Sequence, residues 1–420
     1  MPSFLLVLFF VLLQTCPCRT LIIVGQGHLR TRGRRYRDDP AYSMGLSMSL
    51  DRQQQKRQVE SKQSSCRQFF EAFNDRVNER VDKADRVQCV SSDMSDTLLV
   101  NMTSITVAQQ GATFFSEDTI NFVKRFTANG GSALVRLSEK DAEVMSNMWG
   151  LASTVFDEID RLEGEDRKNT GLRYQNLIRR NDKLATSKKA GYNYVETNNR
   201  DESLRALEDI VGNSSASKVA LDSWNTLTEI GTQLAAMITT VLLSMEHRKA
   251  HTLMEHLIGR PDEEKSISFQ RLARYMEASQ EEERTMNLGS HCDWSIFTIV
   301  PVSDVSGLQV YDISSQTWIC PEAVARIHAG NNLSERWNGS YAVVMAGKYL
   351  ELLTNGKVES TIHRVVSPRN TARRYSAPFF LRLNLEVLDA LENVPLEQPN
   401  NVLVSSLAMS KFLQGLSLSS

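Results

Sequence analysis

The C-terminal half of the chain contains a series of short apolar runs, and this series restricts the fold more than any other feature. The runs are rich in Val, Ile and Tyr and are separated by turn residues, as β-strands are. Several short strands at such spacing are typical of a β-sandwich or a jelly roll. The runs are residues 268–275, 296–302, 308–312, 341–346, 361–366 and 379–385.

A turn signal lies between two of these runs, at Thr354-Asn355-Gly356-Lys357. Asn and Gly accept the positive φ angles that a type I′ turn requires. The segment therefore predicts a tight hairpin between two strands.

Upstream of the runs, the hydrophobic pattern changes to helical spacing. Residues 118–126 carry apolar side chains on one helical face, and so does the segment that follows Ser138. Asp141 lies three residues after Ser138, as in a capping box. Short strands are expected at residues 96–100 and 133–137.

The longest amphipathic segment runs from Leu221 to Met245, with apolar residues every three or four positions. Its central apolar part is too short and too mixed for a membrane span, which predicts a core helix. Residues 163–216 are polar and charged, and we expect long loops there. The predicted fold class is α+β, with a double-stranded β-helix (jelly-roll) core flanked by N-terminal helices that include this long one.

These patterns divide the chain into five predicted segments. They are a signal peptide at 1–18, a basic and polar disordered arm at 19–92, a helical N-terminal region at 93–260, a jelly-roll domain at 261–390 and a helical tail at 391–420.

The first residues point to the secretory pathway. The ten-residue apolar run from Phe4 to Leu13 fits the core of a signal peptide, although no Lys or Arg precedes it. A buried N-terminal strand is the alternative. Glycosylation triplets also favour secretion, each one weakly. They begin at Asn101, Asn213, Asn332 and Asn338.

The segment after the apolar run is unusually basic. Residues 19–37 hold six arginines and no acidic residue, which suits a propeptide or a second targeting signal as well as a solvated linker. The expected location is lumenal or secreted, with an organelle reached through a bipartite N-terminal signal as the alternative. No stable membrane span is expected after signal removal.

Four cysteines remain beyond the predicted signal peptide: Cys66, Cys89, Cys292 and Cys320. An even number permits disulfides without requiring them, and Cys66 with Cys89 is the first pair to test. The net charge of −2 gives no overall basic field, so no nucleic-acid partner is expected. The sequence leaves the oligomeric state open.

Two separated motifs together suggest a metal site. His291 and Asp293 stand at i and i+2, which places both side chains on one face of a strand. His363 lies within another predicted strand, and two His with one carboxylate form the facial triad of non-haem Fe(II) oxygenases. Taken alone, a His-x-Asp motif is more often a surface ion pair.

A third motif follows at Arg374-Tyr375-Ser376. Arg374 and Ser376 share one face of a predicted strand and can hold a carboxylate through a guanidinium fork and a hydroxyl. Without the triad, a surface strand cation would be the preferred interpretation of Arg374.

Taken together and in this order, the motifs between residues 265 and 390 resemble those of the isopenicillin N synthase-like, Fe(II)- and 2-oxoglutarate-dependent dioxygenases. They are similar to the family's His-x-Asp strand, Gly-Leu-Gln-Val turn, following tryptophan, Thr-Asn-Gly hairpin, His-Arg-Val strand and Arg-x-Ser strand with trailing aromatics. The matching residues are 291–310, Trp318, 353–365, 374–376 and 379–380.

The resemblance implies an oxidoreductase that uses Fe(II), 2-oxoglutarate as co-substrate and O2 on a small-molecule substrate, with ascorbate as a supporting reductant. It implies that His291, Asp293 and His363 bind the iron. It also implies that Arg374 and Ser376 bind the distal carboxylate of 2-oxoglutarate.

Tyr275, at the end of a predicted strand, would contact the co-substrate by the same resemblance; a core-edge aromatic is nearly as good an interpretation. The spacing from His363 to Arg374 is one residue longer than the family's, which leaves Arg373 as a minor alternative anchor. The competing functions are a non-catalytic jelly-roll binding protein, an Fe(II) oxidase of the same fold that does not use 2-oxoglutarate, and a hydrolytic metalloenzyme.

Overall fold

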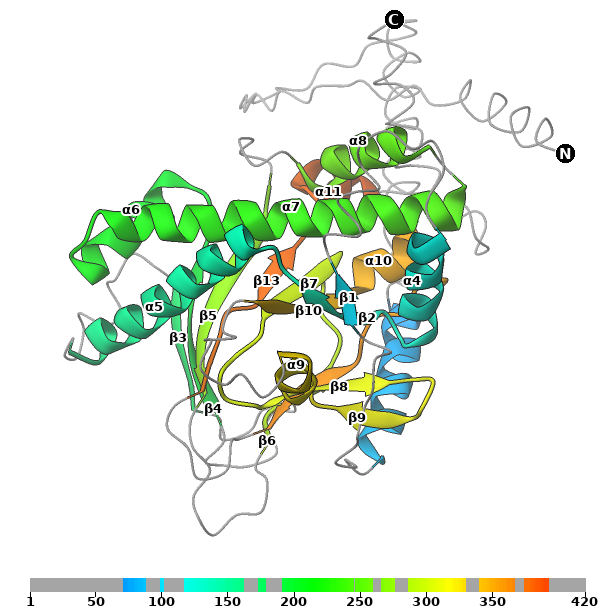
Figure 1. Cartoon of the computed structure of the whole chain (residues 1–420), viewed down its shortest axis with the longest axis horizontal. Helices are drawn as coiled ribbons and strands as arrows, with labels where there is room; N and C mark the ends of the chain where they lie inside the picture. Colours follow the sequence, from blue (N-terminus) through cyan, green and yellow to red (C-terminus); the bar gives the residue numbers. More distant parts are fainter. Residues whose placement is uncertain are drawn as a thin grey trace, which may run out of the picture. The chain divides into compact units, whose positions relative to one another are not determined.

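Figure 1 shows a computed structural model of the chain. The predicted signal peptide, the Cys66–Cys89 pair, the sequons at Asn332 and Asn338 and the chain after residue 392 lie outside the described residues. The structure describes residues 71–87, 99–101, 117–161, 173–178, 191–244, 246–259, 266–275, 286–329, 340–366 and 374–392.

Two β-sheets form the centre of the described chain, and all their pairings are antiparallel except that of β1 with β2. In the larger sheet, β12 (Arg374–Ser376) pairs with β5 beside the main series. That series runs in the order β1 (Leu99–Asn101), β2 (Ser132–Arg136), β10 (Tyr341–Ala346), β7 (Phe297–Pro301), β13 (Phe379–Leu381), β5 (Phe269–Tyr275), β4 (Gly191–Thr197) and β3 (Arg173–Ile178).

The smaller sheet lies across a hydrophobic core from the larger one. Buried side chains from both sheets fill this core, including Val300 and Tyr275 from the larger sheet and Val310 and Val365 from the smaller. The predicted jelly-roll core is confirmed. The smaller sheet runs in the order β6 (Met286–His291), β11 (His363–Val366), β8 (Leu308–Asp312) and β9 (Thr317–Ile319).

Helices cover the other face of the larger sheet, and the longest of them, α7, crosses it (Figure 1). The close approach depends on Gly231, because a Cβ there would lie 2.6 Å from a methyl group of Leu381 on β13. Helix α7 is long and apolar enough to cross a membrane, but 67% of its apolar window is buried within the protein, as predicted for a core helix. The helices are α4 (Glu117–Ala128), α5 (Glu139–Arg161), α6 (Asp201–Val211), α7 (Ser215–Leu243), α8 (His247–Ile258), α9 (Pro321–Ala329), α10 (Lys348–Leu353) and α11 (Leu385–Glu392).

The predicted N-terminal cap of α5 is present. The Asp141 amide donates to Ser138 Oγ at 3.2 Å, and the Ser138 hydroxyl donates to Asp141 Oδ2 at 2.6 Å. The strand expected at 133–137 and the helix expected at 118–126 are also found, with shifts of one or two residues.

The prediction of a disordered arm over residues 19–92 is wrong for residues 71–85, which form a helix. Its apolar side chains, among them Phe73 and Val77, pack into a cluster with Cys292 and Trp318. Charged residues surround these few apolar positions, so the local composition resembles a solvated segment although one face is buried.

The prediction of long loops over residues 163–216 is also wrong, because β3, β4 and α6 lie there. Strand β4 lies between β3 and β5 and buries Tyr194 and Val195. It also buries Asn193 and Thr197, and this mixture of polar and apolar buried positions conceals the strand period.

The hairpin predicted at Thr354–Lys357 is wrong in its flanking elements. Asn355 and Gly356 do have positive φ angles, of 53° and 73°. The turn follows helix α10, however, where the Gly356 amide donates to the Glu351 carbonyl. The same backbone conformation ends a helix here instead of joining two strands.

Candidate active site

The three predicted metal ligands meet where β6 ends and the antiparallel strand β11 begins. His291 is the last residue of β6, and His363 is the first residue of β11 and lies directly opposite it. Asp293 follows β6 by two residues, and its carboxylate oxygens lie 3.5 Å from His291 Nε2 and 3.3 Å from His363 Nε2. One ligand atom from each residue lies within 4.8 Å of the others, so all three can contact one ion.

Backbone carbonyls orient both imidazoles. His291 Nδ1 lies 2.8 Å from the Gly289 carbonyl oxygen, and His363 Nδ1 lies 3.2 Å from that of Thr361. With Nδ1–H donating to a carbonyl, each Nε2 is directed towards the carboxylate and could bind a metal ion through its lone pair, which is the usual arrangement of metal-binding histidines.

The carboxylate of Asp293 is also oriented by a neighbour. The Thr298 hydroxyl donates to Asp293 Oδ2 at 2.6 Å. Burial by itself raises the pKa of Asp293, but the imidazoles of His363 and His291 hold this pKa well below its usual range. Burial lowers the pKa of His363, and Asp293 reverses that effect and raises it. The carboxylate is therefore available as an anionic ligand.

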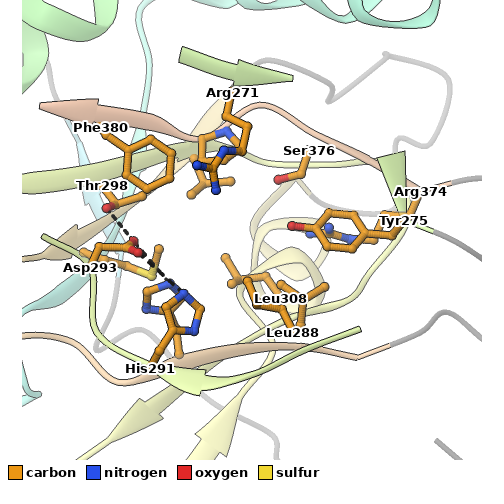
Figure 2. A pocket seen from close by; sticks show the side chains of 15 residues that line it. Arg271, Tyr275, Leu288, His291, Asp293, Thr298, Leu308, Arg374, Ser376 and Phe380 are labelled. Atoms are coloured by element: carbon orange, nitrogen blue, oxygen red, sulfur yellow. Dashed lines mark hydrogen bonds and ion pairs between the residues drawn. The ribbon is translucent and has the colours of Figure 1, made fainter. Parts of the chain in front are cut away.

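A pocket opens from this cluster between the two sheets (Figure 2). Tyr275, Arg374 and Ser376, the residues predicted to bind the co-substrate, line it together with the three metal ligands. In Figure 2 they lie across the pocket from His291 and Asp293. The remaining lining residues are Arg271, Leu288, Thr298, Val300, Leu308, Met345, Val365, Pro378 and Phe380.

Arg374 is buried, with only 1% of its surface exposed. It pairs with Tyr275 across β12 and β5, and its guanidinium lies 4.9 Å from the centre of the tyrosine ring. Gly307 leaves room for the Arg374 side chain, because a Cβ at residue 307 would lie 2.7 Å from Arg374 Cδ and Nε. Arg373, the alternative anchor, lies outside the described residues.

One nitrogen of the Arg374 guanidinium has no hydrogen-bond partner among the described residues. Nε donates to the Val305 carbonyl at 3.0 Å, and Nη2 donates to Glu322 at 2.8 Å. Nη1 is buried and has no hydrogen-bond partner among the described residues. A buried donor of this kind is costly unless a ligand satisfies it, so the arginine fits a bound carboxylate.

Two features were not expected from sequence: Arg271 in the pocket, and Glu322 bound to the pocket residue Arg374. Arg271 stands four residues before Tyr275 on β5, hence on the same face, and its guanidinium lies 4.2 Å from the Tyr194 ring and contacts Glu196. This period-two spacing could have placed it in the pocket. Glu322 gave no such signal, because nothing in the sequence pairs it with Arg374.

Cys292, between the two N-terminal ligands, and Cys320 are both free thiols. Cys292 points away from the pocket and belongs to the cluster formed with residues 71–85. Burial raises its thiol pKa to about 12, so the thiol is protonated at neutral pH.

The donor set fits Fe(II). Two imidazoles and one carboxylate on one side of an ion leave the opposite positions open for a co-substrate and O2. The orphaned Nη1 of Arg374, across the pocket, fits the far carboxylate of a bound dicarboxylate.

Comparison with known proteins agrees with this geometry. Residues 268–383 match the family model described as the 2OG-Fe(II) oxygenase superfamily. This part of the chain belongs to that superfamily. The matched range includes all three ligands, Tyr275, Arg374 and Ser376, so the predicted resemblance is confirmed.

Curated relatives support the membership of this 2OG-Fe(II) oxygenase domain. The 2-oxoglutarate-Fe(II) type oxidoreductase hxnY of Emericella nidulans is 29% identical over 126 residues, which are 30% of this chain and 32% of the relative. Azadirone synthase LFS of Melia azedarach is 36% identical over 94 residues, 22% of this chain and 23% of the relative. The matches span at most about a third of these relatives.

Among solved structures, a full-length Neurospora crassa protein in complex with alpha-KG and thymine is similar to this chain. It has a TM-score of 0.52 and 14% identity, and the match covers 77% of this chain and 98% of the Neurospora protein. This likeness shows a shared fold that extends beyond the residues of the family match.

Proposed function

We propose that the protein is an Fe(II)- and 2-oxoglutarate-dependent dioxygenase that hydroxylates a small organic molecule and releases succinate and CO2. One observation carries the proposal: His291, Asp293 and His363 converge at one end of a pocket, and the orphaned Nη1 of Arg374 lies in the same pocket. In this assignment the triad binds Fe(II), and Arg374 and Ser376 bind the distal carboxylate of 2-oxoglutarate.

The bound metal supplies the oxidising chemistry: 2-oxoglutarate provides two electrons by decarboxylation, one oxygen atom of O2 enters succinate, and the other enters the substrate. The protein positions the reactants. Asp293 and the two histidines fix the metal, and Thr298 prevents the carboxylate of Asp293 from rotating. Arg374 fixes the far end of the co-substrate.

Apolar side chains keep water away from the reacting atoms. Leu288, Leu308 and Val365 contribute them from the smaller sheet, and Val300 and Phe380 from the larger. Such a lining suits a substrate with an apolar carbon skeleton and excludes bulk water around the metal.

Succinate formation tests the proposal. Protein purified without oxygen, supplied with Fe(II), ascorbate and 2-oxoglutarate, is expected to form succinate slowly even without substrate, and His363→Ala is expected to form none. A binding protein would form none in either case. An oxidase that uses no 2-oxoglutarate would consume O2 with a substrate and leave succinate absent.

We also propose that the protein enters the secretory pathway. The apolar run from Phe4 to Leu13 supports this proposal, as does Asn213, which is exposed between α6 and α7 within an Asn-Ser-Ser sequon. Secretion from a eukaryotic host, with sequencing of the mature N-terminus, is the test. A mass shift on deglycosylation that is lost in Asn213→Gln would support it, and an intact N-terminus in a cytosolic fraction would refute it.

A further inference from the structure

A buried carboxylate, Glu322, forms an ion pair with Arg374, the proposed anchor of the co-substrate. Glu322 Oε1 lies 2.8 Å from Arg374 Nη2, and the two side chains are 2% and 1% exposed. At so little exposure, solvent screens the pair weakly, so each charge strongly affects the other. The arginine that would attract the distal carboxylate of 2-oxoglutarate is already paired.

Glu322 is itself held firmly in this position. The Leu308 amide donates to the same Oε1 at 3.0 Å, and the Cys320 thiol donates to Oε2 at 3.4 Å. The residue also lies in the first turn of α9, where the helix dipole favours a negative charge. Glu322 is therefore held in place beside Arg374 by three hydrogen-bond partners.

The pairing determines which part of Arg374 a ligand can reach. Nε donates to the Val305 carbonyl and Nη2 donates to Glu322, whereas Nη1 has no hydrogen-bond partner among the described residues. The Nε–Nη2 edge, one of the two edges through which arginine can contact a carboxylate with two nitrogens, is therefore occupied. A ligand carboxylate would also lie across the guanidinium from the Glu322 carboxylate, and two like charges at that separation repel.

We propose that Glu322 is a positioning residue that lowers the affinity and the charge selectivity of the co-substrate site. It holds Arg374 so that Nη1, with the hydroxyl of Ser376 on the same strand, receives the distal group of the 2-oxo acid. Its charge offsets the attraction of the arginine for a carboxylate. This inference rests on the proposed function.

The consequence is weak discrimination between 2-oxo acids by their distal charge. An unpaired buried arginine prefers a dicarboxylate over its uncharged analogue by roughly a hundredfold, the effect of one charge-assisted hydrogen bond. With Glu322 present, 2-oxoglutarate should bind less than about thirtyfold more tightly than 2-oxopentanoate, which has a methyl group in place of the distal carboxylate.

Titration calorimetry of the full chain loaded with Mn(II) measures both affinities without turnover. A ratio of the two dissociation constants below about thirtyfold supports the proposal, and a larger ratio overturns it. Because this comparison uses the unaltered protein, it decides the matter even where a variant fails to fold.

Glu322→Gln isolates the charge. The glutamine carbonyl can still accept from Arg374 Nη2 and from the Leu308 amide, so the geometry is kept while the negative charge is lost. The dissociation constant of 2-oxoglutarate is expected to fall by about tenfold, and that of 2-oxopentanoate to stay within about twofold. Glu202→Gln, which removes an exposed carboxylate on α6, should change neither constant.

The outcomes separate the two proposals. If neither the unaltered protein nor Glu322→Gln binds 2-oxoglutarate, the proposed function is wrong. If the unaltered protein binds it and Glu322→Gln binds it equally or more weakly, the dioxygenase assignment stands and the role given to Glu322 is wrong. A merely structural role would weaken both ligands together, whereas a charge role changes one of them.

Discussion

His363 lies directly opposite His291 in the antiparallel pair of β11 and β6, and the two imidazole ring centres are 4.3 Å apart. Opposite residues of an antiparallel pair point to the same face, so this register brings two histidines that are distant in sequence together at the proposed metal site. A shift of one residue would turn His363 to the other face. The metal site therefore depends on the pairing of these two strands.

Removal of a ligand should abolish iron retention. His363→Ala or Asp293→Ala leaves two donors, and iron bound after anaerobic reconstitution and desalting is expected to fall by at least tenfold. Metal analysis of the desalted protein measures this. His251→Ala, a histidine on α8 that contacts Glu255, is the matched control and should keep its iron. Equal iron in all three variants would contradict the assigned triad.

Loss of the Thr298 hydroxyl should weaken iron binding less than loss of a ligand does. Thr298→Val keeps the shape of the side chain but removes the donor to Asp293 Oδ2, and we expect a loss of iron affinity between tenfold and a hundredfold. Competition with a chelator of known affinity measures it. Thr298→Ser keeps the hydroxyl and should stay near the unaltered protein; equal losses in both variants would show that packing matters and the hydrogen bond does not.

Cys320 should be unreactive at mildly alkaline pH. Burial, with the Glu322 carboxylate as the second cause, raises the pKa of its thiol from the usual value of 9.0 to about 12. Three units of pKa reduce the thiolate fraction at pH 8 by about a thousandfold, so alkylation should be slow and should rise about tenfold per pH unit up to about pH 11. Peptide mapping after iodoacetamide treatment follows this one thiol.

In denatured protein, the same thiol should react at the rate of an ordinary cysteine. Rapid alkylation of the folded protein at pH 8 would contradict the half-buried position of Cys320 beside Glu322.

Gly307→Ala should damage the co-substrate site and leave the metal site intact. The added methyl group would lie 2.7 Å from Arg374 Nε and 3.0 Å from the Val366 carbonyl oxygen, so the arginine must move. We expect 2-oxoglutarate to bind at least tenfold more weakly, measured by calorimetry on Mn(II)-loaded protein, with unchanged metal content. Gly150→Ala on α5, where a Cβ meets no atom within 4 Å, is the control. Unchanged affinity in Gly307→Ala would argue that Arg374 does not bind the co-substrate.

Phe73→Ala should destabilise the protein although residue 73 lies outside residues 268–383, which match the family model. Its ring is 3% exposed and lies 6.2 Å from the Trp294 ring, and truncation of a buried Phe costs about 3–5 kcal/mol. Chemical denaturation measures the free energy of unfolding. A change below about 1 kcal/mol would show that the helix at 71–85 adds little to the fold.

Several strands and the His291–Asp293 pair could be predicted because their signals are local. His291 and Asp293 share a strand face through their spacing alone, and the Val- and Ile-rich runs mark buried strands. The convergence of His363 on them needed the family resemblance, since spacing within one strand says nothing about its partner.

Other features could not be predicted, because their cause lies in long-range contacts. Glu322 pairs with Arg374 across 52 residues of chain, and no local pattern indicates it. Strand β4 buries Asn193, which only its neighbours in the sheet explain. The helix at 71–85 buries a narrow apolar stripe within a charged sequence, so its composition resembled that of a solvated arm.

The helix at residues 71–85 contacts residues that are next to the proposed metal ligands. Asp85 contacts Ser290, which precedes His291, and lies 3.7 Å from the guanidinium of Arg364, which follows His363. Trp318 donates to the Ala84 carbonyl at 3.2 Å. The structure that supports the proposed iron ligands is thus longer than residues 268–383, which match the family model. A recombinant fragment beginning near residue 268 would lack the contacts of this helix, whereas proteolysis that stops before residue 71 would leave them intact.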